Sequence, residues 1–333
     1  MKRVTLKDVA ARAGVSFSTV SRALNDRPEI SAQTKAQVNA ACKELGYIPN
    51  IAARGLVRRE TRTIGLLVPD ISNDYFAGVA LAVEKTAREN GYRVLVCSSL
   101  RDPVRESEAL DGLLSQQVDG VILAPVSVTS ARQLEQMLQS VPHIYLGNNH
   151  SDTCSYVVVD NKRGAYEATR YLLCLGHRNI LFLGGHTDSL TRQYRVRGFR
   201  KAMEETADTK AQELVECNSA QQTDRMIEHL LREKDLPDAI FAHSDRIALR
   251  VLQAADECGI AIPDQLSLMG FDNISYADLP RINLTTVSQH KGRIGHTAVL
   301  RLLAQIGGST EQTVDVLKPE LMIRGTCRAR SVR

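Results

Sequence analysis

The stretch "TLKDVAARAGVSFSTVSRALN", from Thr5 to Asn25, predicts two short helices joined by a glycine turn. Thr5 is a favoured helix N-cap, and Asp8 places a carboxylate near the positive end of the helix dipole. Apolar residues recur at helical spacing until Gly14, which ends the helix in a left-handed turn. Ser16 caps a second helix that extends to about Asn25. This arrangement is typical of the DNA-binding helix-turn-helix, with an ordinary helical hairpin as the alternative.

The second predicted helix carries one polar face without an acidic residue. Ser18, Ser21, Arg22 and Asn25 recur at positions i, i+3, i+4 and i+7 of this helix. An arginine side chain can bind guanine through two hydrogen bonds in the major groove, and serine hydroxyls suit phosphates or bases. The face therefore favours the DNA-binding interpretation.

The rest of the first sixty residues predicts a small helical head and a linker. The spacing of Phe17 to Val20 and Leu24 predicts a core position for the Phe17 ring. A third helix is expected from the cap Ser31, and Pro49 then breaks the helical pattern. A short helix after Asn50 is marginal in water, so we expect it to form only when something holds it. Residues 58–63 are an exposed linker.

Composition indicates a soluble globular protein of 333 residues, long enough for more than one domain. Its apolar runs are too short to cross a bilayer, and no apolar signal segment follows the basic start, so we expect a cytoplasmic protein. The seven cysteines are scattered and form no C-x-x-C pair, so we expect neither a disulfide framework, nor a metal, nor a cofactor.

Positive charge is concentrated at one end of the chain. Residues 1–60 hold eleven Lys and Arg against five Asp and Glu, a net charge of +6, whereas the whole chain carries +4. The remaining residues therefore carry −2. This asymmetry predicts a polyanionic partner for the head only.

From Ile64 onward, short apolar runs alternate with helical stretches such as 77–90 and 224–233. Such alternation predicts parallel sheets with helices on both faces, and the length predicts two lobes that part near 159–161. The predicted strands are "TIGLLVPD", "GYRVLVCSS", "VDGVILAP", "PHIYLG", "SYVVVD", "RNILFLGG", "ELVEC", "DAIFAHS", "LSLMGFD" and "TTVSQ".

Ligands of open α/β sheets bind beyond the carboxyl ends of the strands. This rule nominates the loops 70–76, 186–197, 243–245 and 271–273, which hold carboxylates, amides, arginines and aromatic rings. Such groups suit a polyol or a sugar.

Each nominated loop also has a structural alternative. The arginines in and just after the second loop could form a solvated basic face, which is the favoured reading for all but one of them. Asp272 could form a turn, and Tyr75 and Phe76 could belong to the core. The arginines in question are Arg192, Arg195, Arg197 and Arg200.

The segments "VTLKDVAARAGVSFSTVSRALN", "ELGYIPNIAARGL" and "GFDN" resemble the LacI/GalR family of bacterial transcription regulators, and the resemblance covers essentially the whole chain. It implies an all-α three-helix head with a hinge helix, joined to a two-lobed α/β sensor like a periplasmic sugar-binding protein. The implied domains are the head 1–48, the hinge and linker 49–62 and the sensor 63–333. Lobe 1 would hold about 63–160 and 290–318, and lobe 2 about 161–288 and 319–333, with the second and third crossings near 288–290 and 317–324.

The resemblance implies a repressor whose affinity for a pseudo-palindromic operator depends on a small polar effector between the lobes. Phe17 would then contact the major groove, against the periodicity, and we follow the resemblance. Leu56 would wedge into the minor groove, where a buried linker residue is the alternative. The implied DNA-binding residues are Thr5, Ser16, Phe17, Ser18, Thr19, Ser21, Arg22, Asn25, Asn50, Ala53 and Leu56.

The same resemblance assigns the effector pocket. Arg195 and Asp272 would contact effector hydroxyls, Asn73, Tyr75 and Phe76 would line the pocket, and Ser244, Asp245 and Gln289 would make secondary contacts. Many relatives carry a stacking aromatic ring where this chain has Asn218 and Ser219, and the chain contains no tryptophan. A sugar or sugar acid is therefore favoured over a flat purine-like effector.

A homodimer is expected, because the chain reaches Arg333 without the leucine heptad that makes some relatives tetramers. Whether the effector is an inducer or a corepressor is left open. An enzyme is the rival class, but the sequence contains no G-x-G-x-x-G, Walker A, H-E-x-x-H or G-x-S-x-G motif. A periplasmic carrier would need an export signal and would have no DNA-binding head. A recombinase would need a catalytic nucleophile, and no nucleophile constellation is visible in the sequence.

Overall fold

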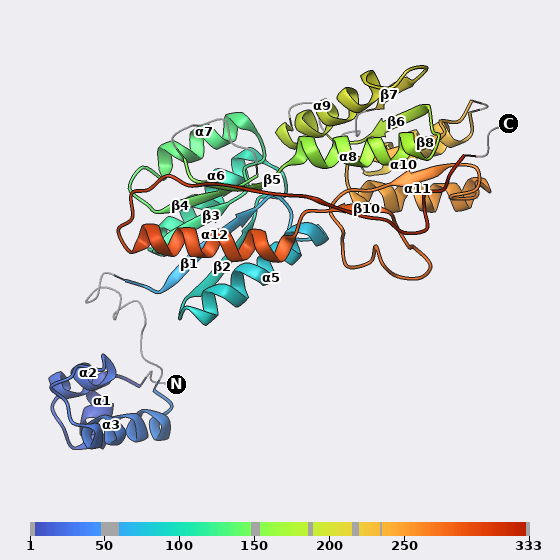
Figure 1. Cartoon of the computed structure of the whole chain (residues 1–333). Coiled ribbons are helices and arrows are strands. Elements are labelled where there is room, and N and C mark those ends of the chain that lie inside the picture. The colour runs from blue at the N-terminus through green and yellow to red at the C-terminus, as the bar shows by residue number, and fades with distance from the viewer. Residues whose placement is uncertain are drawn as a thin grey trace. The chain divides into compact units, whose positions relative to one another are not determined.

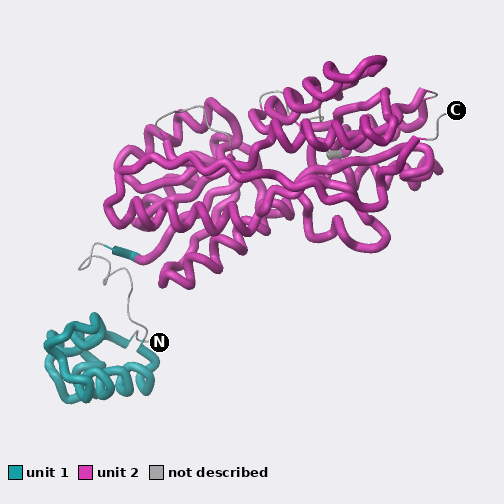
Figure 2. The backbone as a smooth tube through the Cα atoms, in the orientation of Figure 1, with its two compact units in different colours: residues 1–61 teal, residues 62–333 magenta. Residues whose placement is uncertain are grey.

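The computed structural model describes residues 4–47, 60–147, 154–185, 189–214, 220–233 and 235–330. It divides into two compact units, residues 1–61 and 62–333, coloured teal and magenta in Figure 2. The predicted hinge residues Asn50, Ala53 and Leu56 lie outside the described residues, as do Asn218 and Ser219.

The head, residues 4–47, folds as the helices α1 (Leu6–Ala13), α2 (Phe17–Leu24) and α3 (Ala32–Leu45), as the sequence predicts (Figure 1). Asp8 accepts hydrogen bonds from the backbone N–H and the hydroxyl of Thr5, at 2.8 and 2.7 Å. Gly14 ends α1 at a φ of +65°. Ser16 and Ser31 each accept a hydrogen bond from the backbone N–H three residues later, which fixes the starts of α2 and α3.

A small apolar core holds the three helices against one another. Val9, Val20 and Val38, one from each helix, are fully buried, and the small residues Ala10 and Ala13 pack beside them. Helices of eight residues are marginal by themselves. Their stability in the head therefore comes from this shared core.

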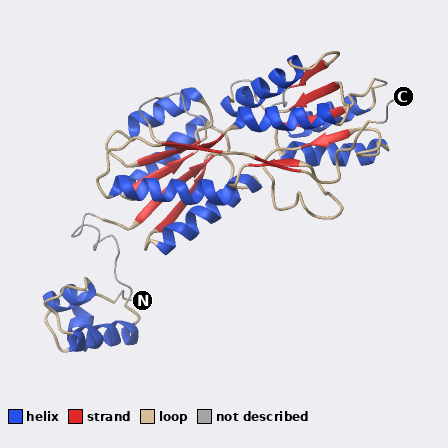
Figure 3. Cartoon of the chain, viewed as in Figure 1, coloured by secondary structure: helices blue, strands red, loops and turns tan. Residues whose placement is uncertain are grey.

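Unit 2 contains two lobes built on separate parallel sheets (Figure 3). Lobe 1, residues 62–159 and 291–317, has a six-stranded sheet in the order β11-β5-β4-β3-β1-β2, covered by α5 and α12 on one face and by α6 and α7 on the other. Its elements are β1 (Thr63–Val68), α5 (Asp74–Glu89), β2 (Arg93–Ser98), α6 (Pro103–Ser115), β3 (Gly120–Leu123), α7 (Val128–Met137), β4 (His143–Leu146), β5 (Tyr156–Val159), α12 (Lys291–Ile306) and β11 (Val314–Leu317).

Lobe 2, residues 161–288 and 320–330, has a four-stranded sheet in the order β7-β6-β8-β9. Helices α8 and α9 cover one face of this sheet, and α10 and α11 cover the other. Its elements are α8 (Asn161–Cys174), β6 (Asn179–Leu183), α9 (Leu190–Glu204), β7 (Lys210–Leu214), α10 (Ala220–Leu231), β8 (Ala239–Ala242), α11 (Asp245–Cys258), β9 (Ser267–Met269), and the antiparallel pair β10 (Thr286–Ser288) and β12 (Glu320–Met322).

Within the described residues, the chain passes between the lobes after Val159, after Ser288 and after Leu317. The strand-helix alternation predicted from the apolar runs is confirmed in both lobes. The first two residues of the predicted strand "ELVEC" are the end of β7, and residues 215–217 lie outside the described residues. The first residues of β7 were not predicted, because this edge strand begins with exposed residues, among them Lys210. The edge strand β11 and the three-residue strand β12 were not predicted, because neither contains a long run of buried apolar residues.

Helices α8 and α9 pack closely at Gly198. A Cβ atom added there would lie 2.1 Å from the backbone oxygen of Lys162 and 2.9 Å from the backbone nitrogen of Tyr166. Both obstacles are backbone atoms, which cannot rotate away. The position of α9, which carries Arg195, therefore depends on the missing side chain at Gly198.

We expect Gly198→Ala to lower the free energy of unfolding by about 1–3 kcal/mol, the usual cost of overpacking. Guanidinium denaturation of the full chain would measure the change. Gly112→Ala in α6 is the matched control, because nothing lies within 4 Å of an added Cβ there. The control should retain stability or gain up to about 1 kcal/mol of helix propensity. Equal stability of the two variants would contradict the close packing.

Candidate DNA-binding surface and ligand cleft

Helix α2 presents the polar face that the sequence predicts. Ser18 and Arg22 are exposed, whereas Val20 and Ala23 point into the core of the head. Among the described residues no carboxylate pairs with Arg22, although Arg12 and Lys35 elsewhere in the head each form an ion pair, with Glu44 and Asp26. An unneutralised arginine on an exposed helix suits the edge of a base or a phosphate.

Three hydroxyl groups gather at the beginning of α2. The Ser16 hydroxyl lies 2.8 Å from the hydroxyls of both Ser18 and Thr19, and it accepts the backbone N–H of Thr19 at 3.0 Å. The N-terminus of a helix carries partial positive charge, and hydroxyl donors add to it. The half-buried Ser21 and Asn25 follow along the same helix.

Phe17 is 51% exposed, so the core position predicted from its spacing is wrong. It is the first residue of α2, and helical side chains point toward the N-terminus of their helix. Its ring therefore projects past the turn that buries Val20. The exposure agrees with the contact surface that the resemblance implies for this residue.

In unit 2, Arg195 on α9 is 2% exposed, and its side chain is held on several sides. Its Nε donates to Oδ1 of Asn161 at 2.9 Å, and one terminal nitrogen donates to the backbone oxygen of His243. The guanidinium carbon lies 3.6 Å from the centroid of the Phe271 ring, and Nη2 lies 3.6 Å from Oδ1 of Asp272. Arg195 is thus fixed in one orientation by groups from three segments.

Asp272 and Gln289 meet because β10 runs beside the end of β9. The backbone N–H of Asp272 donates to the oxygen of Val287 at 2.8 Å, and Nε2 of Gln289 donates to Oδ1 of Asp272 at 2.5 Å. Asp272 has a φ of +128°, a strained conformation for a residue with a side chain. The turn therefore positions the carboxylate at some cost in backbone energy.

Burial dominates the electrostatics of this cluster. Burial is the main reason that the pKa of Asp272 is raised to about 7; the charge of Arg195 lowers this pKa and that of Asp245 raises it. Burial also lowers the pKa of Arg195 and raises the pKa of Tyr75, whose phenol interacts with Asp272 and Arg195 across the lobe boundary. The structure thus brings Arg195, Asp272, Gln289 and Tyr75 together.

Asp245 is fully buried and both of its oxygens are engaged. Oδ2 accepts the backbone N–H of Ile274 at 2.9 Å, and Oδ1 accepts the hydroxyl of Thr286. A Cβ atom on Gly270 would lie 2.1 Å from Oδ1, so that glycine leaves room for the carboxylate. These bonds hold the turn after β9, and Asp245 faces the protein interior.

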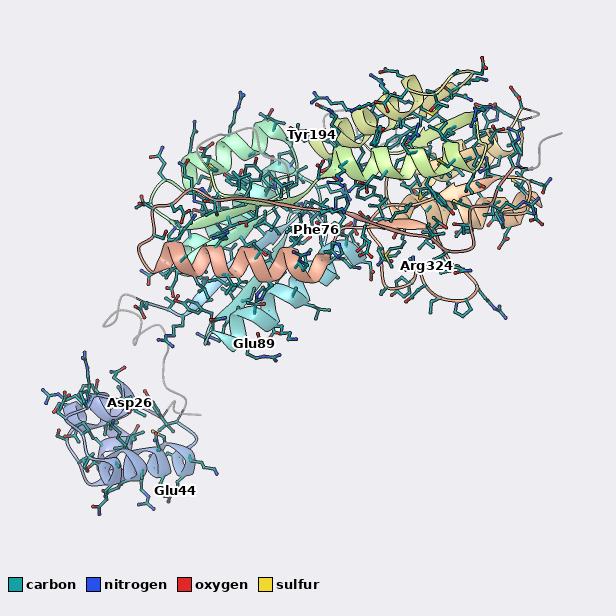
Figure 4. The ribbon with its side chains drawn as sticks, in the orientation of Figure 1. Asp26, Glu44, Phe76, Glu89, Tyr194 and Arg324 are labelled. Atoms are coloured by element: carbon teal, nitrogen blue, oxygen red, sulfur yellow. The ribbon has the colours of Figure 1, made fainter. Side chains whose placement is uncertain are left out.

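The remaining predicted pocket residues lie on both lobes. Asn73 and Ser244 cap α5 and α11 by accepting backbone N–H groups. Tyr75 and Phe76 touch edge to face, with ring centroids 5.0 Å apart, and pack partly against the core of lobe 1. Phe76 lies at the end of α5 that is nearest lobe 2 (Figure 4).

The basic-face alternative is wrong for Arg192 as well as for Arg195. Arg192 is buried, donates to the backbone oxygen of Gly184 at 3.1 Å and lies 3.4 Å from Glu213. Arg197 and Arg200 are exposed, as that alternative predicts. Four arginines of one helix thus divide into a buried pair and an exposed pair.

Direct hydrogen bonds join the lobes beside the cluster. Asp74 of α5 accepts the backbone N–H of Ser275 at 2.8 Å, and Nζ of Lys291 donates to the oxygen of Asn273 at 2.9 Å. Arg246 donates to Oδ2 of Asp70 at 3.0 Å. Sequence reasoning missed Lys291, although its position directly after the predicted crossing was a signal.

A recess lies between the lobes. Its cavity volume is about 70 Å³, and it is lined by residues 125–128, 131, 145–147 and 189–191. The loops after β3 and β4 that line it were not nominated from the sequence, although the carboxyl-end rule applies to them equally. The described residues bring together no group of His, Cys, Asp and Glu that could hold a metal ion, and among them no helix is long and apolar enough to cross a membrane.

Comparison with known proteins gives the same two parts. The profile of bacterial regulatory proteins of the lacI family matches residues 5–50, and that of periplasmic binding protein-like domains matches residues 169–327. The HTH-type transcriptional regulator DegA of Bacillus subtilis (strain 168) is 35% identical over 330 residues, which cover 97% of either chain.

Solved structures are similar over nearly the whole chain. The lac repressor dimer bound to operator and the anti-inducer ONPF has a TM-score of 0.87 and 29% identity, covering 98% of this chain and 100% of that one. The complex of the transcriptional regulator CelR with cellobiose has a TM-score of 0.72 and 30% identity, covering 97% and 100%.

The raised pKa of Asp272 predicts a stability that falls as pH rises. The folded protein holds this proton up to about pH 7, whereas an aspartate in the unfolded chain loses it near ~3.9. The contribution of Asp272 to stability is therefore greatest below about pH 4 and declines toward pH 7. We expect the fall in melting temperature from about pH 5 to about pH 7.5 to be smaller in Asp272→Asn. The exposed Asp256→Asn should behave as wild type, and equal slopes in all three proteins would refute the assignment.

Proposed function

The chain belongs to the LacI family of bacterial regulatory proteins, and on that premise we propose that it is a repressor whose affinity for its operator is controlled by a small polar effector. It is a DNA-binding transcription regulator rather than an enzyme. One observation carries the proposal: a head with an acid-free, exposed polar helix shares its chain with a two-lobed unit that buries a charged, strained cluster beside a cleft. Because it acts on chromosomal DNA, we propose that it works in the cytoplasm.

In this proposal α2 lies in the major groove. Phe17, Ser18 and Arg22 contact base edges, and the hydroxyls around the start of α2 contact phosphates together with Thr5, Ser21 and Asn25. The proposal is supported by the exposure of Phe17 and Arg22 and by the excess of positive charge in residues 1–60. Asn50, Ala53 and Leu56 would form the hinge helix in the minor groove.

We propose a homodimer that matches the two-fold symmetry of the operator. Strand β2 is an edge of the lobe-1 sheet, and its Leu95 and Val96 are 39% and 46% exposed. Exposed apolar edge strands are normally covered. A second copy of this chain is the occupant we propose, as in the similar lac repressor dimer.

The effector is proposed to be a sugar or a sugar derivative. Arg195 and Asp272 would bind its hydroxyls, with Gln289 behind Asp272 and with Tyr75 and Phe76 against the ring. Asn73, Ser244 and Asp245 would act as positioning residues, since their side chains already bind backbone groups of the protein. The cellobiose bound by the similar CelR supports the carbohydrate class.

The arrangement of the two lobes would control DNA binding. An effector that contacts both lobes favours one arrangement of them, and this arrangement sets the separation of the two linkers in the dimer. The hinge helices are marginal, so a small change in separation decides whether both fold on the DNA. Coupling of this kind typically amounts to ~1–3 kcal/mol.

We expect Arg22→Ala to weaken binding to the operator by roughly tenfold to a hundredfold while binding to unrelated DNA changes little, because a base contact carries specificity. Gel-shift titration at fixed salt would measure both affinities. Arg12→Ala removes the same charge from α1 and should retain discrimination. An Arg22→Ala protein that still prefers its operator as strongly as wild type would move the recognition surface elsewhere.

We expect Arg195→Lys to weaken effector binding by at least about tenfold without unfolding the chain, because lysine retains the charge but not the planar fork of donors. The measurement is the shift in melting temperature produced by a panel of sugars that includes cellobiose. Arg197→Lys, on the exposed side of α9, is the control. If Arg195→Lys responds as strongly as this control, the cluster is not the binding site.

A further inference from the structure

Lys291 belongs to lobe 1, but its side chain reaches lobe 2. It is the first residue of α12, and its side chain is 19% exposed. The stem lies on α5, since a Cβ atom added at Gly78 would be 2.9 Å from Cδ of Lys291. Nζ donates to the backbone oxygen of Asn273 at 2.9 Å and lies 3.9 Å from Oδ2 of Asp74. The ammonium group therefore lies at the boundary between the two lobes.

The turn after β9 is bound to lobe 1 through a cation and an anion. Its Asn273 carbonyl accepts the ammonium group of Lys291, and its Ser275 N–H donates to the carboxylate of Asp74 at 2.8 Å. The Ser275 hydroxyl donates to the same carboxylate at 3.0 Å. The hydrogen bond of the Ser275 N–H is lost when the lobes separate, so the exchange of this amide with solvent reports on their contact.

This turn also carries two buried carboxylates of lobe 2. Asp272 is 5% exposed and Asp245 is fully buried. Burial is the largest cause of the raised pKa of both groups, and the positive charges of Arg195 and Lys291 lower it. Arg195 is part of lobe 2, whereas Lys291 is part of lobe 1. One of the two cations that stabilise the ionised pair is therefore present only while the lobes are in contact.

Other polar groups face the turn without changing this difference between the lobes. Arg324 donates to the side chain of Asn273 and to the backbone oxygen of Leu284, so its charge stays with lobe 2 in any arrangement. The remaining groups are the phenol of Tyr75, the amide of Gln289, and His290, which lies 3.7 Å from Glu320.

We propose that Lys291 is a positioning residue that neutralises the buried aspartate pair of lobe 2 from lobe 1, so that the lobes meet while the pair is ionised. A carboxylate that loses its hydration is costly unless a cation replaces the water. Without Lys291, protonation of Asp272 is the alternative way to remove the charge. Contact between the lobes would then raise the pKa of Asp272 further above that of an exposed aspartate, and contact would become stronger as the pH falls.

The inference rests on the proposed function only for its consequence. Where lobe contact controls operator binding, Lys291 keeps this control effective at a pH at which the aspartates are ionised. The test uses neither effector nor DNA. Its failure would leave the proposed function standing, and a failure of the proposed function would leave the test valid.

The test measures hydrogen exchange of the Ser275 amide in the full chain by mass spectrometry. Exchange is expressed as a protection factor relative to the amides of β6, inside lobe 2, at pH values on both sides of the Asp272 pKa of about 7. Lys291→Met removes the charge and retains an unbranched stem. We expect its protection, relative to wild type, to fall at least about tenfold at about pH 8 but less than about threefold at about pH 5.5.

Three further variants separate charge from packing. Lys291→Arg retains the charge and should keep wild-type protection within about threefold at either pH. Arg293→Met removes an exposed cation from the same helix and should behave as wild type. In Lys291→Met combined with Asp272→Asn, protection at about pH 8 should return to within about threefold of that of Asp272→Asn alone, because the buried charge is gone. His290 is present in all of these proteins, so its protonation is common to them.

The pH dependence decides between neutralisation and a simple tie between the lobes. An equal loss of protection in Lys291→Met at both pH values overturns the proposal, because the lysine would then hold the turn without regard to the charge of the aspartates. No loss at either pH overturns it as well. A double variant that remains unprotected at about pH 8 would show that Asp272 is not the charge that Lys291 neutralises.

Discussion

The buried pair of Arg195 and Asp272 is the constraint around which the larger unit is arranged. Removing a guanidinium and a carboxylate from water costs several kcal/mol for each ion unless other groups replace the solvent. Here the replacements are the amide of Asn161, the backbone oxygen of His243, the ring of Phe271 and the amide of Gln289. They come from α8 and from the ends of β8, β9 and β10, so the pair exists only when all of these elements are assembled.

The same turn that holds the carboxylate continues directly into the contact between the lobes. Asn273 accepts Nζ of Lys291, and the backbone N–H of Ser275 binds Asp74. Arg324, labelled in Figure 4, donates to the side chain of Asn273 and braces it from the segment after β12. A molecule bound at Asp272 would therefore contact a turn that is hydrogen-bonded to both lobes. Through this turn the proposed effector would act directly on the arrangement of the lobes.

Sequence patterns predicted local features well and burial less well. Caps at Thr5, Ser16 and Ser31 fixed the helix starts of the head, because a cap depends only on residues three positions away. Helical periodicity failed for Phe17, since a residue in the first turn has no neighbouring turn to bury it. The strands β11 and β12 and the first residues of β7 were not predicted, because these strands lack the continuous apolar run that marks a central strand.

The sequence by itself determined the helical head, the alternating α/β architecture and the segments in which Arg195 and Asp272 lie, because propensity, capping and the carboxyl-end rule act over short stretches of chain. The segment 186–197 was expected as a loop, but from Leu190 onward it is helix α9. Only the tertiary structure decided which charges are buried. On one helix Arg192 and Arg195 are enclosed while Arg197 and Arg200 face solvent. The enclosing groups come from segments as far apart as Asn161 and Asp272. The recess is likewise formed by loops of lobe 1 together with the start of α9, and no local sequence pattern predicts this contact between distant segments.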